Sequence, residues 1–465
     1  MFYFTIFAKN MIKNSLFKIK NLAVWLSLLI TLVYSFHVLY RSNLFTPKYV
    51  IAWDVNHYYD YLPAAFILHD LKTMESDDPS VVYWALWLPN GNSVSKTTMG
   101  VAFCYAPFFL VANALAEPLG YVKNGFTEPY AWALVFSSIF YLFWGFYFLF
   151  KTLKKLGFSD LVTSIVVAAI GLCTNLYWYA TFSAPYSHSY SFTAITLFLY
   201  LTLLWHEKPC VKNSIFVGLT AGLLTLMRPS NIVVVLVFVF YNARKFGEVK
   251  DKMLFFLKEY KQILIIVVCA ICVWVPQFVY WKVVTGSLFF YSYGDDERFF
   301  FNDPKIYEVL FGWRKGWLVY TPVMVFSVIG LFMLPWRRKD FSIGIIAFFV
   351  LQVYIISSWW CWWYGGSYGM RPMIDVYGIM AVPFAVFLQW LFENKRLTVK
   401  IPILLLFAWL AFRSAFNTYR YYTGAIHYES MSKKAYFYSY WGDKTGEFNS
   451  LLENPNYKAA KLGKR

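Results

Sequence analysis

Charged side chains are scarce in this chain. They make up 14% of its 465 residues, whereas soluble domains usually carry about 25%. Histidine and cysteine are also rare, with six of each. This composition excludes a disordered chain, a coiled coil, a disulfide scaffold and an ordinary cytosolic enzyme. Cys269 and Cys272 have C-x-x-C spacing, but they lie inside the apolar run Ile263–Val283, so we predict inert helix residues.

Motifs of familiar soluble enzymes are missing as well. The sequence has no H-E-x-x-H, P-loop or EF-hand spacing and no clear internal repeat. Gly365–Gly369 matches the G-x-S-x-G pattern, which in a serine hydrolase occupies a strand–turn–helix. Here the pattern stands between two apolar runs, and we interpret it as a chance match.

Apolar residues dominate instead, with 59% hydrophobic and 22% aromatic. Because a helix needs about 20 residues to cross a membrane, the apolar runs predict an all-α polytopic transmembrane protein with about 11–13 spans over residues 1–412. A polar tail, residues 413–465, follows. The runs are Leu22–Tyr40 and segments near 100–118, 130–150, 161–180, 189–205, 214–227, 229–241, 263–283, 317–335, 341–359, 373–391 and 401–412.

Basic residues give the orientation. The net charge is +17, from 42 Lys and Arg against 25 Asp and Glu. The bases gather in short connectors, as the positive-inside rule expects of cytoplasmic loops, and this pattern argues against nucleic-acid binding. The basic stretches are the start, with Lys9, Lys13, Lys18 and Lys20, and then Lys151–Lys155, His206–Lys212, Arg244–Lys261, Arg337–Lys339 and Lys395–Lys400.

The stretches between them are predicted to face outward. The first outer loop, residues 41–98, carries six acids against four bases. If 100–118 and 130–150 both crossed, Lys151–Lys155 would lie outside, so we expect 100–118 to be re-entrant or interfacial. For the tail, alternation predicts the outer side and its basic excess predicts the inner side. The other outward stretches are Ser183–His188, Thr285–Lys315 and Trp359–Asp375.

The first outer loop holds a candidate catalytic acid in Trp53–Tyr61. A helix there places Asp54, His57 and Tyr58 on one face, at i, i+3 and i+4. A carboxylate beside aromatic rings at the membrane boundary can act as a general base for a hydroxyl. The alternative is a solvated loop carboxylate.

Three further stretches carry polar groups beside apolar runs. His188 opens a span and is a candidate site residue. The alternative is that the neighbouring serines cap the helix and that His188 is a hydrogen-bonded structural residue. Arg228 lies between two apolar runs and therefore needs a partner or an anionic ligand. The alternative is that its side chain extends to the membrane–water interface. Arg314 and Lys315 stand between tryptophans and suit a lipid phosphate, although an interfacial anchor has the same pattern.

The densest stretch is Trp359–Asp375. Its aromatic cluster includes Trp363 and Tyr364, its glycines let the backbone approach a ligand closely, and Arg371 and Asp375 follow at i and i+4. An aromatic belt explains the tryptophans but not the Gly-Gly-Ser-Tyr-Gly-Met-Arg-Pro segment. The acidic pair Asp77–Asp78 and the acidic triplet Asp295–Glu297 could each bind a hard cation. The simpler interpretation is that both are solvated acidic loops.

These motifs resemble those of GT-C glycosyltransferases, enzymes that use polyprenyl-phosphate sugars and include protein O-mannosyltransferases and the aminoarabinose transferase of lipid A. The basic start, the single span and the outer loop with an early acid follow that layout. The segment Lys96–Gly100 with Ala106-Pro107 looks like a degenerate family motif. Arg228-Pro229 and the glycine-rich loop ending at Asp375 are similar to bacterial members of Bacteroidetes type.

The resemblance implies sugar transfer from a polyprenyl-phosphate donor to a glycan, lipid or protein acceptor, with inversion, at the outer face of the bacterial inner membrane. It makes Asp54 the base. The family's paired acid is replaced by Asp54-Val55-Asn56-His57, so either Asp60 substitutes or the site needs no metal; a divalent cation stays open. The expected groups are Asp54, His57 and Asp60 in catalysis; Lys96, Arg228, Arg314, Lys315 and Arg371 at the donor phosphate; and Tyr58, His188, Trp363, Tyr364 and Asp375 in the substrate pocket.

Two other classes remain open. A transporter or lipid flippase carries ionisable residues within its spans, often in two matching halves, whereas the spans here are nearly free of acids. An oligosaccharide polymerase or ligase of another membrane family would rely on arginines in a late outer loop and would tolerate the loss of Asp54.

Overall fold

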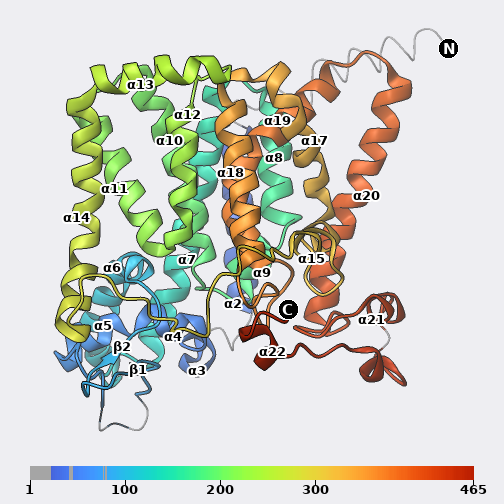
Figure 1. The fold of residues 1–465 in the computed structure, drawn as a ribbon. Coiled ribbons are helices and arrows are strands. Elements are labelled where there is room, and N and C mark those ends of the chain that lie inside the picture. Colours follow the sequence, from blue (N-terminus) through green and yellow to red (C-terminus); the bar gives the residue numbers. More distant parts are fainter. Residues whose placement is uncertain (1–21, 41–44, 77, 79–80, 443) are drawn as a thin grey trace.

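Long helices standing side by side form a bundle in the computed structural model, which describes residues 22–40, 45–76, 78, 81–442 and 444–465 (Figure 1). Within these residues the only sheet is a two-stranded antiparallel hairpin of β1 (Leu86–Trp87) and β2 (Ser93–Val94). The prediction of an all-α fold is confirmed. The predicted basic start (Lys9 to Lys20), Arg41 and Asp77 lie outside the described residues.

Five helices in the described residues are long and apolar enough to cross a membrane, which makes this a multi-pass membrane protein. They are α7 (Glu128–Lys155), α14 (Tyr260–Thr285), α18 (Lys339–Ser358), the continuous η7 (Arg371–Val376) and α19 (Tyr377–Glu393), and α20 (Leu397–Tyr422).

Further helices, most of them shorter, complete the bundle, and the predicted number of about 11–13 spans stays a prediction. These are α2 (Leu22–Tyr40), α8 (Asp160–Leu172), α10 (His188–Glu207), α11 (Val211–Met227), η4 (Pro229–Val234) with α12 (Val235–Phe240), and η6 (Pro322–Met324) with α17 (Val325–Arg337).

The remaining elements, most of them short, lie mostly at the two ends of the bundle. They are α3 (Pro47–Val50), α4 (Asp54–Tyr59), α5 (Tyr61–Pro63), the π-helix η2 (Ala64–Leu68), α6 (Gly100–Leu115), η3 (Glu117–Leu119), α9 (Leu176–Thr181), η5 (Phe246–Glu248), α13 (Val249–Lys258), α15 (Ile306–Phe311), α16 (Trp317–Tyr320), α21 (Lys433–Tyr438), η8 (Phe448–Leu451) and α22 (Tyr457–Lys461).

Small residues let the long helices approach one another. A Cβ on Gly222 of α11 would lie 2.7 Å from the Ala270 carbonyl oxygen of α14, and one on Gly330 of α17 would lie 1.9 Å from the Pro383 carbonyl oxygen of α19. Membrane helices gain stability from such close backbone packing, because lipid removes the hydrophobic drive between them. The contact with α17 fixes α19, whose preceding turn η7 carries Arg371.

The predicted cytoplasmic connectors meet at one end of the bundle, the basic end. Lys155 pairs with Glu207 at 2.6 Å, and Arg337 pairs with Glu393 at 2.8 Å. Arg338 donates to the Leu156 carbonyl at 2.8 Å. Connectors far apart in the sequence therefore share one end, as the charge pattern predicts.

The first outer loop and the tail share the opposite end, the outer end (Figure 1). Arg314 donates to the Glu429 carbonyl of the tail at 3.2 Å. Arg465 donates to the carbonyls of Ser358 and Trp359, where α18 ends, at 3.1 and 2.8 Å. The tail therefore follows the alternation of spans, and its basic excess does not determine its side.

Helix α6 begins and ends at this outer end. Gly100 lies against the last turn of α11, where a Cβ would be 2.2 Å from the Met227 nitrogen. Beyond α6, Asn124 donates to Asp78 of the first outer loop at 3.0 Å. Both ends of α6 therefore lie near the outer end, as expected of a segment that does not cross, and α7 can then carry Lys151–Lys155 to the basic end.

This topology can be checked by cysteine labelling. Asp303→Cys, in the loop between α14 and α15, should react with an impermeant thiol reagent applied from outside intact cells. Lys154→Cys and Arg338→Cys, in the basic connectors, should react only after the membrane is opened. Labelling of Lys154→Cys in intact cells would contradict the orientation.

Candidate active site

The outer end brings the predicted acid and the predicted arginine of the late outer loop into contact. The Oδ2 atom of Asp54 lies 2.7 Å from Nη1 of Arg371. Asp54 opens α4 directly after Trp53, whose φ of 55° is left-handed and turns the chain sharply. Exposed fractions of 37% for the Asp54 side chain and 16% for that of Arg371 leave the pair within reach of a ligand.

A second acid–arginine pair, with a buried carboxylate, lies beside the first. Nη1 of Arg228, at the end of α11, lies 3.2 Å from Oδ2 of Asp375 in η7. Nη2 of Arg228 donates to the Ser187 hydroxyl at 2.9 Å. The Asp375 side chain is 2% exposed. Arg228 thus has the partner that its apolar setting demands, and η7 supplies one residue to each pair.

Tyrosines and a histidine surround the two pairs. Tyr58, on the next turn of α4, lies within electrostatic range of both Arg228 and Arg371. His188 is fully buried against the ring of Tyr179, with centroids 4.6 Å apart, and neither ring nitrogen has a partner among the described residues. Tyr58 and His188 therefore lie beside the two pairs, and their role in a substrate pocket stays a prediction.

Sequence reasoning missed Tyr179, Tyr186 and Tyr293. The first two lie within electrostatic range of Arg371, and Tyr293 lies within range of Asp54 and Arg228. Tyr186 stands in the polar segment that opens α10 and was within reach of prediction. With 37 tyrosines in the chain, residue type alone does not single out the other two.

Lys96 lies at the border of this region. Its Nζ atom is 2.9 Å from Oε2 of Glu297 and 5.1 Å from the centre of the Tyr293 ring. Glu297 thus serves as a partner for Lys96.

Among the described residues, no group of three or more His, Cys, Asp or Glu side chains is arranged to hold a metal ion.

His57 and Asp60 differ from Asp54. The His57 ring packs against Trp84 with centroids 5.7 Å apart, and burial lowers the pKa of His57. Asp60 is fully buried, and its Oδ2 accepts from the Trp84 amide at 3.1 Å. Burial raises the pKa of Asp60 well above its usual range. Asp60 therefore lies in a buried setting that disfavours its charged form, unlike the partly exposed Asp54, and its catalytic role stays a prediction.

Arg314 and Lys315 bond to the tail, and Lys315 also lies within electrostatic range of Arg371. The Lys315 side chain is 1% exposed, and its Nζ donates to the carbonyls of Ser367 and Tyr428. Burial lowers the pKa of Lys315 well below its usual range. With two carbonyls on its Nζ atom, Lys315 joins the glycine-rich loop to the tail, and its role at the donor phosphate stays a prediction. Arg314, bonded to the tail, serves the same junction.

The glycine-rich loop has a left-handed backbone at Tyr364, Gly365 and Gly369, with φ of 56°, 65° and 56°. Its Tyr364 hydroxyl donates to the Ile356 carbonyl at 3.1 Å, and its ring lies within electrostatic range of both arginines. Trp363 instead packs against Tyr457 of the tail, with ring centroids 5.4 Å apart. The loop thus connects the tail to the first residue of η7.

The G-x-S-x-G pattern in this loop follows helix α18 and not a strand. The Ser367 hydroxyl donates to the Gly365 carbonyl at 3.3 Å. The structural context of a nucleophile elbow is therefore absent at Gly365–Gly369, in agreement with the sequence interpretation.

No known protein-family model matches the sequence, and no curated protein sequence matches it. Two solved structures of the oligosaccharyltransferase from Archaeoglobus fulgidus resemble the chain, both with a TM-score of 0.47. One holds a tethered acceptor peptide and is 13% identical, and the match covers 92% of this chain. The other, AglB with an inhibitory peptide and a dolichol-phosphate, is 12% identical over the same share. The chain spans 59% and 60% of their lengths.

Proposed function

We propose that this protein is an inverting membrane glycosyltransferase of the bacterial inner membrane. It would move a sugar from a polyprenyl-phosphate donor to a glycan, lipid or protein acceptor on the periplasmic side. The observation that supports this is the Asp54–Arg371 pair, whose carboxylate is accessible, beside the Arg228–Asp375 pair, whose carboxylate is buried. Glycosyl transfer needs a base for the acceptor hydroxyl and fixed positive charge for the departing phosphate, and the two side chains of the accessible pair supply both.

In the proposed reaction, the acceptor oxygen bonds to the anomeric carbon as the bond from that carbon to the phosphate oxygen breaks. The hydroxyl proton passes to Asp54, and the electron pair of the broken bond leaves with the lipid phosphate. Attack from the face opposite the phosphate inverts the anomeric centre. Arg371 would hold the leaving phosphate, and Lys96 and Arg228 would add positive charge nearby.

The pair also suggests how donor binding prepares the base. A carboxylate held by a guanidinium is a weak base, because the positive charge stabilises its ionised form. A donor phosphate can accept two parallel hydrogen bonds from Arg371. It would then draw the guanidinium away from Asp54 and leave the carboxylate to the acceptor hydroxyl.

An apolar groove offers a place for the polyprenyl chain. It has a volume of about 480 Å³ and lies between α5, α6 and α14, with Tyr61, Met99 and Tyr280 among its lining residues. The Ser95 amide donates to the Tyr280 hydroxyl at 3.1 Å, next to Lys96 in the chain. A lipid in the groove would therefore have its head end near Lys96, where the proposed site begins.

Mass spectrometry of lipid-linked sugars and surface glycans tests the proposal in cells with and without the gene. Deletion should remove a glycan modification and cause a polyprenyl-phosphate sugar to accumulate on the outer leaflet, where an impermeant reagent reaches it. A plasmid copy with Asp54→Asn should not restore the modification. Accumulation confined to the inner leaflet would indicate the flippase instead, and an unchanged lipid and glycan profile would contradict both functions.

A further inference from the structure

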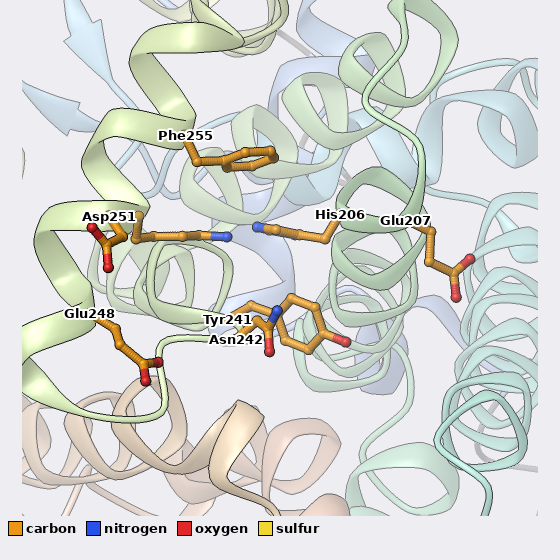
Figure 2. Close-up of a pocket in the computed structure, with 8 residues that line it drawn as sticks. His206, Glu207, Tyr241, Asn242, Glu248, Asp251 and Phe255 are labelled. Atoms are coloured by element: carbon orange, nitrogen blue, oxygen red, sulfur yellow. The ribbon is translucent and has the colours of Figure 1, made fainter.

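A second cavity lies at the basic end, remote from the proposed glycosyl-transfer site. It has a volume of about 510 Å³ and is bounded by the last turn of α10, the chain after α12, and α13 (Figure 2). The proposed reaction uses none of its side chains. The lining residues are His206, Glu207, Tyr241, Asn242, Glu248, Asp251, Lys252 and Phe255.

Lys252 is a buried cation without a counter-ion in this cavity. Its exposed fraction is 9%, and among the described residues it has no hydrogen bond or ion pair. Its Nζ atom lies 4.8 and 4.9 Å from the ring centres of Phe255 and Phe256. Burial lowers the pKa of Lys252 to about 8. Burying an unpaired ammonium is costly, so an anion bound here would relieve that cost.

His206 supplies an unused acceptor. Its Nδ1 atom lies 2.9 Å from the Thr202 carbonyl, which can only accept, so Nδ1 carries the hydrogen and the neutral ring leaves a lone pair on Nε2. Nε2 is buried and has no partner among the described residues. Figure 2 shows the ring pointing toward the middle of the cavity, and the ring is within electrostatic range of Lys252.

Carboxylates line the rim and not the centre. Glu207 pairs with Lys155 at 2.6 Å, and Glu248 accepts from the Arg244 amide at 2.8 Å. Asp251 is exposed. All three carboxylates point away from the middle in Figure 2. A ligand would therefore meet one unpaired cation and one unpaired acceptor inside, and negative charge at the entrance.

Helix α13 indicates where the cavity lies relative to the membrane surface. It lies across the end of the bundle (Figure 1) and exposes Met253, Leu254 and Leu257, with exposed fractions of 40%, 53% and 68%. A helix with an exposed apolar face beside charged residues lies in the headgroup region. The cavity that α13 bounds is therefore open to the headgroups of membrane lipids.

We infer that this cavity binds the headgroup of a phospholipid that carries a primary amine, such as phosphoethanolamine. The phosphate accepts from Lys252, and the ammonium donates to Nε2 of His206 and faces the acidic rim. A phosphatidylglycerol headgroup can donate a hydroxyl to the histidine, but it has no positive charge to face the acidic rim. A choline headgroup has no N–H to donate.

Native mass spectrometry of the full-length protein in detergent tests the inference through the first lipid-binding step. The probes are short-chain phosphatidylethanolamine, phosphatidylcholine and phosphatidylglycerol, and soluble O-phosphoethanolamine. Wild type should prefer phosphatidylethanolamine to the other two lipids. Lys252→Met should weaken its binding about tenfold, as expected for a lost charge-assisted hydrogen bond. Lys250→Met removes an exposed lysine of the same helix and should change nothing.

The outcomes separate the possible ligands. His206→Phe should abolish the preference for phosphatidylethanolamine over phosphatidylcholine. Equal binding of the three lipids by wild type, or unchanged binding by Lys252→Met, would overturn the inference. Binding of O-phosphoethanolamine as tight as that of the lipid would replace the membrane ligand by a soluble amino phosphate ester. If Lys252→Met does not fold, the wild-type preference and His206→Phe decide.

Discussion

Asp54→Asn should lower turnover by about 10²–10⁴-fold, the usual contribution of general-base assistance. The amide keeps the shape of the carboxylate but cannot take the acceptor proton at neutral pH. The variant should insert normally, because Asp54 is partly exposed and pairs with Arg371 at the outer end. A purified-enzyme assay with a short-chain polyprenyl-phosphate sugar and a glycan acceptor measures the effect.

Asp60→Asn is the matched control, six residues further along. Because the Asp60 carboxyl is fully buried and burial raises its pKa, an uncharged amide of the same shape should be tolerated there. Its carbonyl oxygen can still accept from the Trp84 amide, so activity should fall far less than in Asp54→Asn. If Asp60→Asn is inactive and Asp54→Asn is not, the base is misassigned. Full activity of both variants would contradict the proposed mechanism.

The sequence predicts the bundle well because membrane insertion depends on local properties. The length of an apolar run and the bases beside it decide whether and how it crosses, and both can be read without knowing any tertiary contact. The same holds for α6, since a full crossing would have placed Lys151–Lys155 on the wrong side. The side of the tail is different. Its contacts, such as those of Arg465 with the end of α18, are tertiary and leave no local pattern.

The site was predictable as single residues but not as pairs. Asp54, Arg228, Arg371 and Asp375 each stand out because a charge beside an apolar run needs an explanation. Which acid meets which arginine depends on how η7 is placed against α4 and α11. Lys315 shows the limit of prediction from sequence patterns. The local sequence, a lysine beside a tryptophan, is the same whether carbonyls or a phosphate accept the lysine's hydrogen bonds.

Arg371→Ala should reduce kcat/KM by about 10²–10³-fold, the effect of losing one fixed donor at a site of developing charge. Arg371→Lys keeps the charge but loses the two-pronged geometry, so its defect should be smaller. Arg298→Ala, which removes an exposed arginine at the same end, should have little effect. Wild-type activity of Arg371→Ala would remove this residue from the site.

The proposed exchange of partners at Arg371 predicts a second effect of Asp54→Asn, on donor binding. If the donor phosphate must draw Arg371 away from Asp54, then removing the carboxylate charge should tighten donor binding while abolishing turnover. A partly exposed ion pair contributes about 0.2–1 kcal/mol, so the gain should be at most about fivefold. The gain should vanish in Arg371→Ala, because no guanidinium is left to be released. Donor binding that is weaker in Asp54→Asn than in wild type would show that the carboxylate itself helps to hold the donor. In that case the donor phosphate would not replace the Asp54 carboxylate as the partner of Arg371.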